Sequence, residues 1–368
     1  MSGTSVDGID AALVKIDRDG ARLIASHEHP LPAPVVDEIH AISQPGANEI
    51  ERLGPLDRQL GVLFAEAALA LLERAKVSPA EVTAIGSHGQ TVRHRPPSAG
   101  HSAQASFTLQ IADPNTIAEV SGITTVADFR RRDIAADGEG APLAPAFHAA
   151  TMGCEDGNRA IINIGGIANA TLLECRRLVK GFDTGPGNTL LDAWCRKHTG
   201  QSFDRGGNWS ASGTVAPDLL ARLLEHPYFA LDGVRSTGKE HFNLAWLETC
   251  LAAFPALVPV DVQSTLCEFT ATTIHAAVTD SGLAVDEIFL CGGGVHNADL
   301  LARLQTHFAP LPVTTTTTLG VDPDWVEAMA FAWLAARRMM QLTGNAPAVT
   351  GAAGERILGG IYPGLSDS

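Results

Sequence analysis

The sequence predicts an α/β protein of two domains, with a ligand bound in the cleft between them. Segments typical of strands and of helices alternate along most of the chain, which is the pattern of α/β folds. A length of 368 residues suits two domains at roughly 100–200 residues each. Both halves open with a glycine-containing turn beside a strand, at residues 3–8 and 164–169, and this weak repeat suggests a duplicated domain. The segment 133–145 is rich in Gly, Ala and Pro, so we expect domains at 1–140 and 141–368.

The first half is expected to combine short strands with one long helix. Apolar residues at helical spacing predict a helix over residues 49–75, which Gly54-Pro55 should bend or interrupt. Asp113-Pro114 should begin a second helix and Gly122 should end it. The loop 93–106, rich in Pro, Ser, Gly and His, predicts a mobile surface segment. The expected strands are residues 10–16, 82–86, 107–111 and 123–129.

The second half repeats the alternation. A helix is expected near 144–152, and another over 189–198 with Asn188 as its cap and Gly200 as its stop. Further helices should begin at Asp299 and at Asp322-Pro323. The expected strands are residues 160–164, 170–173, a strand ending at 181–183, 287–290 and 313–318.

Composition excludes several classes of protein. The formal net charge of −15 disfavours general nucleic-acid binding, because an acidic surface repels phosphates. No apolar run reaches the roughly 18 residues of a membrane helix, and the N-terminus lacks the features of a signal peptide. The six cysteines form no CxxC pair, which predicts buried reduced thiols in a cytoplasmic protein.

Three glycine-containing motifs could carry chemistry. In Gly3-Thr-Ser-Val-Asp-Gly-Ile-Asp10, backbone amides and hydroxyls could bind phosphate, and Asp7 could hold Mg²⁺ through water; a polar hairpin turn is the simpler interpretation. In 181–188, a strand leads into a helix N-terminus, a natural anion site, so Asp183 suits a base or a metal partner unless it only caps a turn. Residues 291–297 could lay an adenine or its ribose against Gly292, Gly293 and Gly294, or form a tight turn.

Nine segments taken together resemble a known family. They occur along nearly the whole chain in the order SGTSVDGID, IGSHGQTVRH, VADFRRRDIA, GAPLAPAFH, INIGGIAN, GFDTGPGN, STGKEHFN, CGGGVHN and EAMAFAWLA. Each is weak alone, but the ordered set is similar to the anhydro-N-acetylmuramic acid kinases. The resemblance implies an actin/hexokinase-like (ribonuclease H-like) two-domain fold with ATP and sugar in the interdomain cleft. It also implies Mg²⁺, a cytoplasmic location and a homodimer.

The resemblance further implies a reaction and a set of site residues. The 1,6-anhydro bridge of the amino sugar would be cleaved and O6 phosphorylated, giving N-acetylmuramate 6-phosphate and ADP. Asp183 would be the base that activates water. The residues implied to contact the sugar are His88, Gln90, Thr91, Arg131 and Glu327. Those implied to bind ATP are Gly3, Thr4, Ser5, Val6, Asp7, Gly8, Ile9, Asp10, Asn163, Gly165, Gly166, Gly185, Gly187, Asn188, Gly292, Gly293 and Gly294.

The chain departs from the family pattern at three places. The first strand expected ahead of the SGTS motif is missing or shortened, so we expect a misassigned start codon and a less stable or less active chain. The segment 137–140 is more acidic than usual, and the loop 93–106 is longer.

Three alternatives remain open from the sequence. The chain could be another sugar kinase of the same superfamily, or an actin- or chaperone-like ATPase that acts through protein interactions. A nucleotide-binding module without catalysis is also possible, although it would leave Asp183 without a role.

Overall fold

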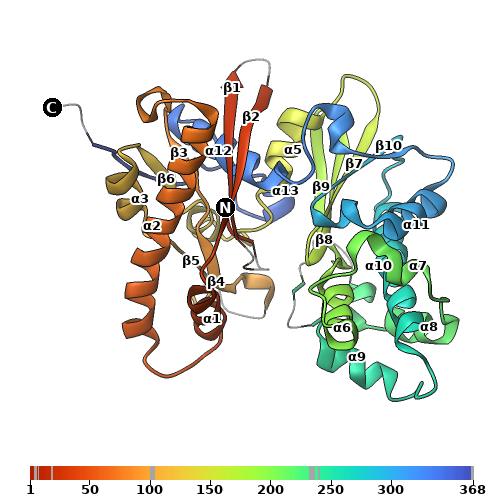
Figure 1. Cartoon of the computed structure of the whole chain (residues 1–368). Coiled ribbons are helices and arrows are strands. Elements are labelled where there is room, and N and C mark those ends of the chain that lie inside the picture. The colour runs from red at the N-terminus through yellow and green to blue at the C-terminus, as the bar shows by residue number, and fades with distance from the viewer. Residues whose placement is uncertain are drawn as a thin grey trace. The chain divides into compact units, whose positions relative to one another are not determined.

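The computed structural model confirms the α/β class and groups the chain into two compact units (Figure 1). It describes residues 1–3, 6, 8–17, 20–99, 104–231, 237–238 and 241–365. The first unit comprises residues 1–151 and 325–368, and the second comprises 152–324. This grouping differs from the contiguous domains expected at 1–140 and 141–368, because helix α12 (Val326–Met339) packs on strands β1 (Gly8–Asp17) and β3 (Ile85–Ser87) of the first unit.

The part of the first unit that the structure describes has three small sheets. Strands β1 (Gly8–Asp17) and β2 (Gly20–Pro30) form an antiparallel pair, as do β4 (Gln90–Arg95) and β5 (Phe107–Ile111). The third sheet has the order β12-β6-β3 and consists of β12 (Gly360–Tyr362), β6 (Thr125–Ala127) and β3 (Ile85–Ser87). The other helices of this unit are α1 (Ala33–Ile42), α2 (Glu49–Ala75), α3 (Pro114–Ser121), α4 (Arg131–Ile134), α5 (Ala144–Met152) and α13 (Pro347–Thr350).

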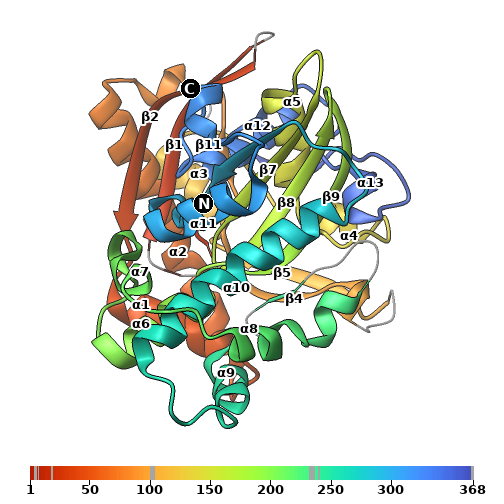
Figure 2. The same ribbon diagram turned by 90° about the vertical axis from the view of Figure 1, so that its right-hand side faces the viewer.

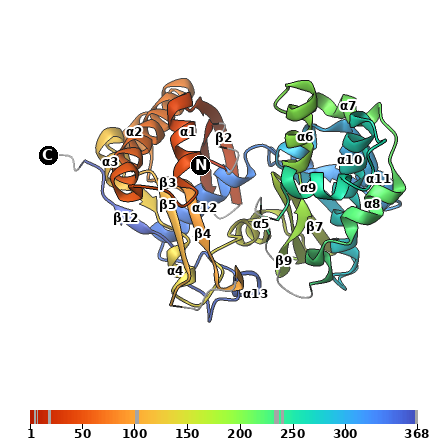
Figure 3. The same ribbon diagram turned by 90° about the horizontal axis from the view of Figure 1, so that it is seen from below.

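Local sequence signals explain the helix ends of the first unit. Asp113 accepts hydrogen bonds from the amides of Asn115 and Thr116 at the start of α3, and Gly122 ends the helix with a φ of 71°. Helix α2 has the predicted bounds, and Pro55 does not interrupt it. The buried face that includes Leu60 and Phe64 explains this, because tertiary packing outweighs the lost backbone hydrogen bond. Figure 3 shows α2 and α3 lying side by side.

Several predicted boundaries were wrong. The strand expected at 82–86 lies at Ile85–Ser87, and the strand expected at 123–129 is limited to Thr125–Ala127. Residues 93–95 of the expected loop belong to β4, because they pair with β5. The expected strand 313–318 ends at Thr315, where a 3-10 turn, Thr316–Leu319, begins.

The second unit is built on one mixed five-stranded sheet. Its order is β11-β10-β7-β8-β9, formed by β11 (Val313–Thr315), β10 (Glu287–Cys291), β7 (Asn158–Ile164), β8 (Ile167–Glu174) and β9 (Arg177–Pro186). Strands β7, β8 and β9 run antiparallel, and β10 and β11 extend the sheet in parallel. This is the ribonuclease H-like order that the resemblance implied.

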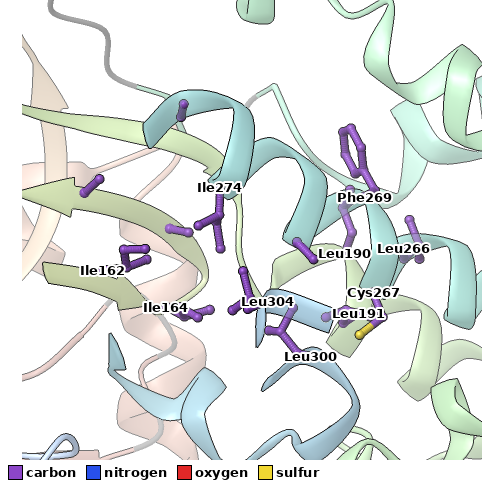
Figure 4. Packing of buried hydrophobic residues seen from close by; sticks show 14 of the residues in the cluster. Ile162, Ile164, Leu190, Leu191, Leu266, Cys267, Phe269, Ile274, Leu300 and Leu304 are labelled. Atoms are coloured by element: carbon purple, nitrogen blue, oxygen red, sulfur yellow. The ribbon is translucent and has the colours of Figure 1, made fainter. Parts of the chain in front are cut away.

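Helices pack on this sheet and complete the core of the second unit. They are α6 (Thr189–Thr199), α7 (Asn208–Ala211), α8 (Pro217–Leu224), α9 (Leu244–Leu251), α10 (Pro259–Thr279) and α11 (Ala298–Phe308). Figure 2 shows α10 running across the sheet. Ile162, Ile274 and Leu304 are each fully buried where sheet and helices meet (Figure 4). Each such side chain stabilises the fold by about 1.5–3 kcal/mol.

Among the described residues, every helix is too short or too polar to span a bilayer.

Candidate functional site

The described residues of the first motif include one strained position ahead of β1. Val6 is buried and has a φ of 60°, which is unusual for a β-branched residue and costs on the order of 1–3 kcal/mol. Its amide donates to the Gly3 carbonyl at 3.3 Å, and the Ser2 hydroxyl donates to the Gly8 carbonyl at 2.9 Å. Strain of this kind is frequent at ligand-binding loops. Gly8, Ile9 and Asp10 belong to β1, while Thr4, Ser5 and Asp7 lie outside the described residues.

His88 is the centre of a buried polar cluster in the first unit. Its Nε2 accepts a hydrogen bond from Arg130 Nε at 2.9 Å, so Nδ1 carries the proton and donates to the Gly89 carbonyl at 2.9 Å. The ring packs on Phe331, with 4.5 Å between centroids. Burial, and then the charge of Arg130, hold the pKa of His88 well below its usual value, so this imidazole is neutral.

Glu327 and Arg130 are linked by their charges. Burial lowers the pKa of Arg130 to about 10, and the carboxylates of Glu327 and Asp133 oppose this shift. Glu327 lies exposed in the first turn of α12. The structure therefore brings two predicted sugar residues, His88 and Glu327, to the same arginine. Sequence analysis missed Arg130 although it stands in the VADFRRRDIA segment, because three consecutive arginines do not reveal which one points inward.

Gln90 and Thr91 are the first residues of β4, which begins shortly after His88. Gln90 is buried, and its Nε2 donates to the Thr91 carbonyl at 3.1 Å. Within the described parts of the chain, the buried Gln90 Oε1 has no hydrogen-bond partner. Thr91 Oγ1 accepts from Gln110 Nε2 at 3.1 Å. An acceptor buried without a donor costs about 1–3 kcal/mol, so Gln90 is suited to receive a donor from a ligand.

Arg131 lies apart from the contacts made by Arg130. Its Nε donates to Asp128 Oδ1 at 2.7 Å, and its side chain is 62% exposed. It shares the rim of a surface cavity of about 570 Å³ with Asp128, Arg132 and Arg338. No hydrogen bond or ion pair joins Arg131 to the His88 cluster in the described structure.

Asp183 lies on β9, opposite Asn169 of β8. Its Oδ2 accepts a hydrogen bond from the Thr237 amide at 2.9 Å. Its own carbonyl oxygen accepts one from the Tyr228 hydroxyl at 2.5 Å. Asp183 is thus held once at its carboxylate and once at its backbone carbonyl, as a residue with a precise role would be. Thr237 stands in the STGKEHFN segment, for which the sequence indicated no separate role. Its contact with Asp183 spans 54 residues, so no local pattern reveals it.

Three amides at the start of α6 donate to carbonyls in the turn after β7. Those of Gly187 and Thr189 donate to the Gly166 carbonyl at 2.9 and 3.1 Å, and that of Asn188 donates to the Gly165 carbonyl at 2.8 Å. A phosphate could accept from them only by displacing this turn. The Asn188 side chain donates to Ile164 and does not cap the helix. A Cβ at Gly187 would lie 2.3 Å from the Gly165 oxygen, so Gly187 permits this close contact.

The third motif follows strand β10, which pairs with β7. Gly292 has a φ of 79°, and a Cβ there would lie 2.4 Å from Asn163 Oδ1. Gly293 and Gly294 begin a short 3-10 turn that ends at His296. Asn163, Gly165 and Gly292 therefore lie close together at the ends of neighbouring strands, while the ATP contacts assigned to them, to Gly185 and to Gly187 stay predictions.

The described residues contain no cluster of three or more His, Cys, Asp or Glu side chains with the geometry of a metal site. The predicted Mg²⁺ residue, Asp7, lies outside them.

Two buried histidines predict that the protein loses stability as the pH falls. Burial lowers the pKa of His148 to about 3, and that of His88 is also depressed, whereas an unfolded histidine titrates near about 6.5. Below that pH the unfolded chain binds more protons than the folded one. The free energy of unfolding should therefore fall by about 1.4 kcal/mol per pH unit for each histidine, and this contribution is complete above pH ~6.5.

Urea unfolding between pH 7.5 and 5.5 measures this effect. His148→Gln should flatten the dependence, and the matched change at the exposed His40, His40→Gln, should not. An unchanged slope in His148→Gln would contradict the prediction.

Comparison with known proteins identifies the family. A family model described as anhydro-N-acetylmuramic acid kinase matches residues 1–364. The anhydro-N-acetylmuramic acid kinase of Shewanella halifaxensis is 51% identical, covering 99% of this chain and 97% of that protein. That of Saccharophagus degradans is 50% identical, covering 98% and 97%. A solved structure, the activator of 2-hydroxyisocaproyl-CoA dehydratase from Clostridium difficile with bound ADPNP, has a TM-score of 0.43 at 10% identity over 92% of this chain and 100% of that chain, too distant to bear on function. The family model and the two relatives place this chain in the anhydro-N-acetylmuramic acid kinase family.

Proposed function

We propose that this protein uses ATP to phosphorylate 1,6-anhydro-N-acetylmuramic acid in peptidoglycan recycling. The observation that carries the proposal is the family match over residues 1–364, together with relatives of that name at about half identity over nearly their whole length. The ordered motifs support it, because they extend over both units.

The proposed reaction opens the anhydro ring while it transfers phosphate. Water attacks the anomeric carbon of the sugar and gives a proton to the carboxylate of Asp183. The bond between C1 and O6 breaks, O6 bonds to the γ-phosphorus, and ADP leaves. The products are N-acetylmuramate 6-phosphate and ADP. A positioned base contributes about 10²–10⁴-fold to such a step, and phosphoryl transfer depends mainly on alignment and charge stabilisation.

In this proposal, the base lies in the second unit and the sugar-recognising residues lie in the first. In the second unit, Asp183 has its carboxylate and its backbone held by separate hydrogen bonds, which suits a base. In the first unit, the neutral His88 and the buried Gln90 would recognise polar groups of the sugar, with Glu327 and Thr91 nearby in the same unit. Arg131 lines a surface cavity with Arg132 and Arg338, and its role as a sugar residue rests on the family resemblance alone.

The proposal includes ATP and Mg²⁺ because the chain belongs to this kinase family. The motif from Gly3 to Gly8, which contains the strained Val6, would bind the phosphates of ATP, and Mg²⁺ would neutralise their charge. Mg²⁺ usually keeps several waters and takes only one or two protein carboxylates, so Asp7 alone could hold it. A cytoplasmic location and a homodimer complete the proposal.

Release of ADP should depend on the sugar. With ATP and Mg²⁺, we expect it to rise sharply when 1,6-anhydro-N-acetylmuramic acid is added and little when glucose is added, because only the anhydro bridge gives water a target at C1. A coupled assay over a panel of anhydro and ordinary amino sugars measures this. Equal turnover with glucose would overturn the substrate while leaving a sugar kinase, and turnover without any sugar would favour an ATPase.

A further inference from the structure

The carboxylate of Asp183 is oriented by a segment far away in the sequence. The Thr237 amide donates to Oδ2 at 2.9 Å, which constrains the direction of this carboxylate oxygen. Hydrogen bonds to a charged acceptor are roughly twice as strong as neutral ones. A shift of the Thr237 backbone would therefore move Oδ2 of Asp183 with it.

Thr237 is itself held by a neighbouring histidine. Its hydroxyl and the Nδ1 of His241 are 3.1 Å apart, which is within hydrogen-bond distance. The carbonyl of Gly238 accepts from the amides of His241 and Phe242 at 3.1 and 3.2 Å. Among the described residues, one side-chain contact and two backbone hydrogen bonds therefore join Thr237 and Gly238 to His241 and Phe242.

The far end of this turn is anchored in the core of the second unit. Phe242 is fully buried and packs against His226 and Trp246, with centroid distances of 4.8 and 5.4 Å. The Asn243 side chain accepts from the Trp246 amide at the start of α9. His241 therefore directly precedes a buried and well-packed residue, and through its Nδ1 it holds Thr237 in place.

A second support acts on the backbone of Asp183. Tyr228 is buried, and its hydroxyl donates to the Asp183 carbonyl at 2.5 Å. The amide of Tyr228 donates in turn to His226 Nδ1 at 3.2 Å, so both supports end in the aromatic group that contains His226 and Phe242.

We propose that Thr237 and His241 are positioning residues for the Asp183 carboxylate, and that Tyr228 positions its backbone. This inference rests on the proposed function, in which Asp183 takes the proton of water. A base must be held within about 0.5 Å of its productive position, and a displacement of 1 Å can cost about 10²-fold in rate. The contact between Thr237 and His241 contributes to this precision, because it holds the residue whose amide binds Oδ2 of Asp183.

Paired variants test the contact between Thr237 and His241. Thr237→Val and His241→Ala should each lower kcat about tenfold, with the KM for ATP changed less than about twofold, because the carboxylate is misplaced while nucleotide contacts remain. Thr237→Ser keeps the hydroxyl and His241→Asn keeps a polar atom near the position of Nδ1, so both should restore most of kcat. Thr249→Val, an exposed threonine on α9, is the matched control and should behave as wild type.

The double variant makes the test specific. If both residues act through one contact, Thr237→Val with His241→Ala should lose about tenfold in kcat, as each single variant does, and not about a hundredfold. A hundredfold loss, an equal loss in Thr237→Ser and Thr237→Val, or full activity in Thr237→Val would each overturn the proposal.

Amide exchange separates this inference from the proposed function. The Thr237 amide should exchange slowly in wild type and at least about tenfold faster in Asp183→Ala and in His241→Ala, since its acceptor or its support is lost. This readout needs no turnover, so it remains valid even if the protein proves inactive on the anhydro sugar. Equal exchange rates in all three proteins would overturn the positioning role.

Discussion

Asp183→Asn should reduce turnover by about 10²-fold or more while changing the affinity for ATP little. Asparagine keeps the shape of the side chain, and its amide oxygen can still accept the Thr237 N–H bond that Oδ2 accepts at 2.9 Å. Only the ability to take a proton is lost. Removing a negative charge near phosphate could even tighten ATP binding slightly. Steady-state kinetics with the anhydro sugar, together with calorimetric titration of ATP, measure the two effects separately.

The control for this experiment is another carboxylate in the same unit. Asp218 is exposed at the start of α8, and Asp218→Asn should retain wild-type turnover. If Asp183→Asn keeps most of its turnover but binds ATP poorly, Asp183 serves the metal or the nucleotide. Glu327, beside the His88 cluster, would then be the first candidate for the base.

Asp133→Ala should destabilise the first unit by about 3 kcal/mol or more. Asp133 is fully buried, and its two oxygens accept three hydrogen bonds of 2.8 Å, from the Gly140 amide, Asn345 Nδ2 and Thr350 Oγ1. These bonds tie two segments far apart in the sequence to α4. Alanine leaves all three donors without this acceptor, and each such loss costs about 1–3 kcal/mol.

Thermal and urea unfolding measure the effect. At about 2–4 °C per kcal/mol for a unit of this size, the melting temperature should fall by about 6–12 °C. The exposed Asp37 on α1 provides the control, and Asp37→Ala should change stability by no more than about 0.5 kcal/mol. A similar loss in both variants would show that the buried hydrogen bonds of Asp133 have no special weight.

Much of the secondary structure is encoded by short stretches of sequence. Helix α3 begins after Asp113-Pro114 and ends at Gly122 as predicted, because capping and the left-handed conformation involve only neighbouring residues. The bounds of α2 and β5 follow in the same way from local periodicity. Boundaries failed where pairing decides them: β4 extends into the expected loop because β5 lies beside it, and β11 ends early at a 3-10 turn.

The candidate site was only partly predictable for the same reason. The family resemblance implied Asp183, His88 and Glu327, and for Asp183 alone the position between a strand and a helix N-terminus also pointed to a base or a metal partner. The motifs could not show that the amides of Gly187 and Asn188 donate to the carbonyls of Gly166 and Gly165 in the turn after β7, because these acceptors lie more than twenty residues earlier in the chain.

By itself, therefore, the sequence determined the α/β class and the family, because these depend on residue types in order along the chain. The segments that carry the chemistry stay predictions. Only the tertiary structure decided that Arg130, and not Arg131, contacts His88, and that residues 325–368 join the first unit. It alone also decided that Tyr228 and Thr237 hold Asp183. The physical reason is that burial and hydrogen bonding between distant segments depend on which side chains the folded chain brings within about 3 Å of one another, and no local pattern specifies this.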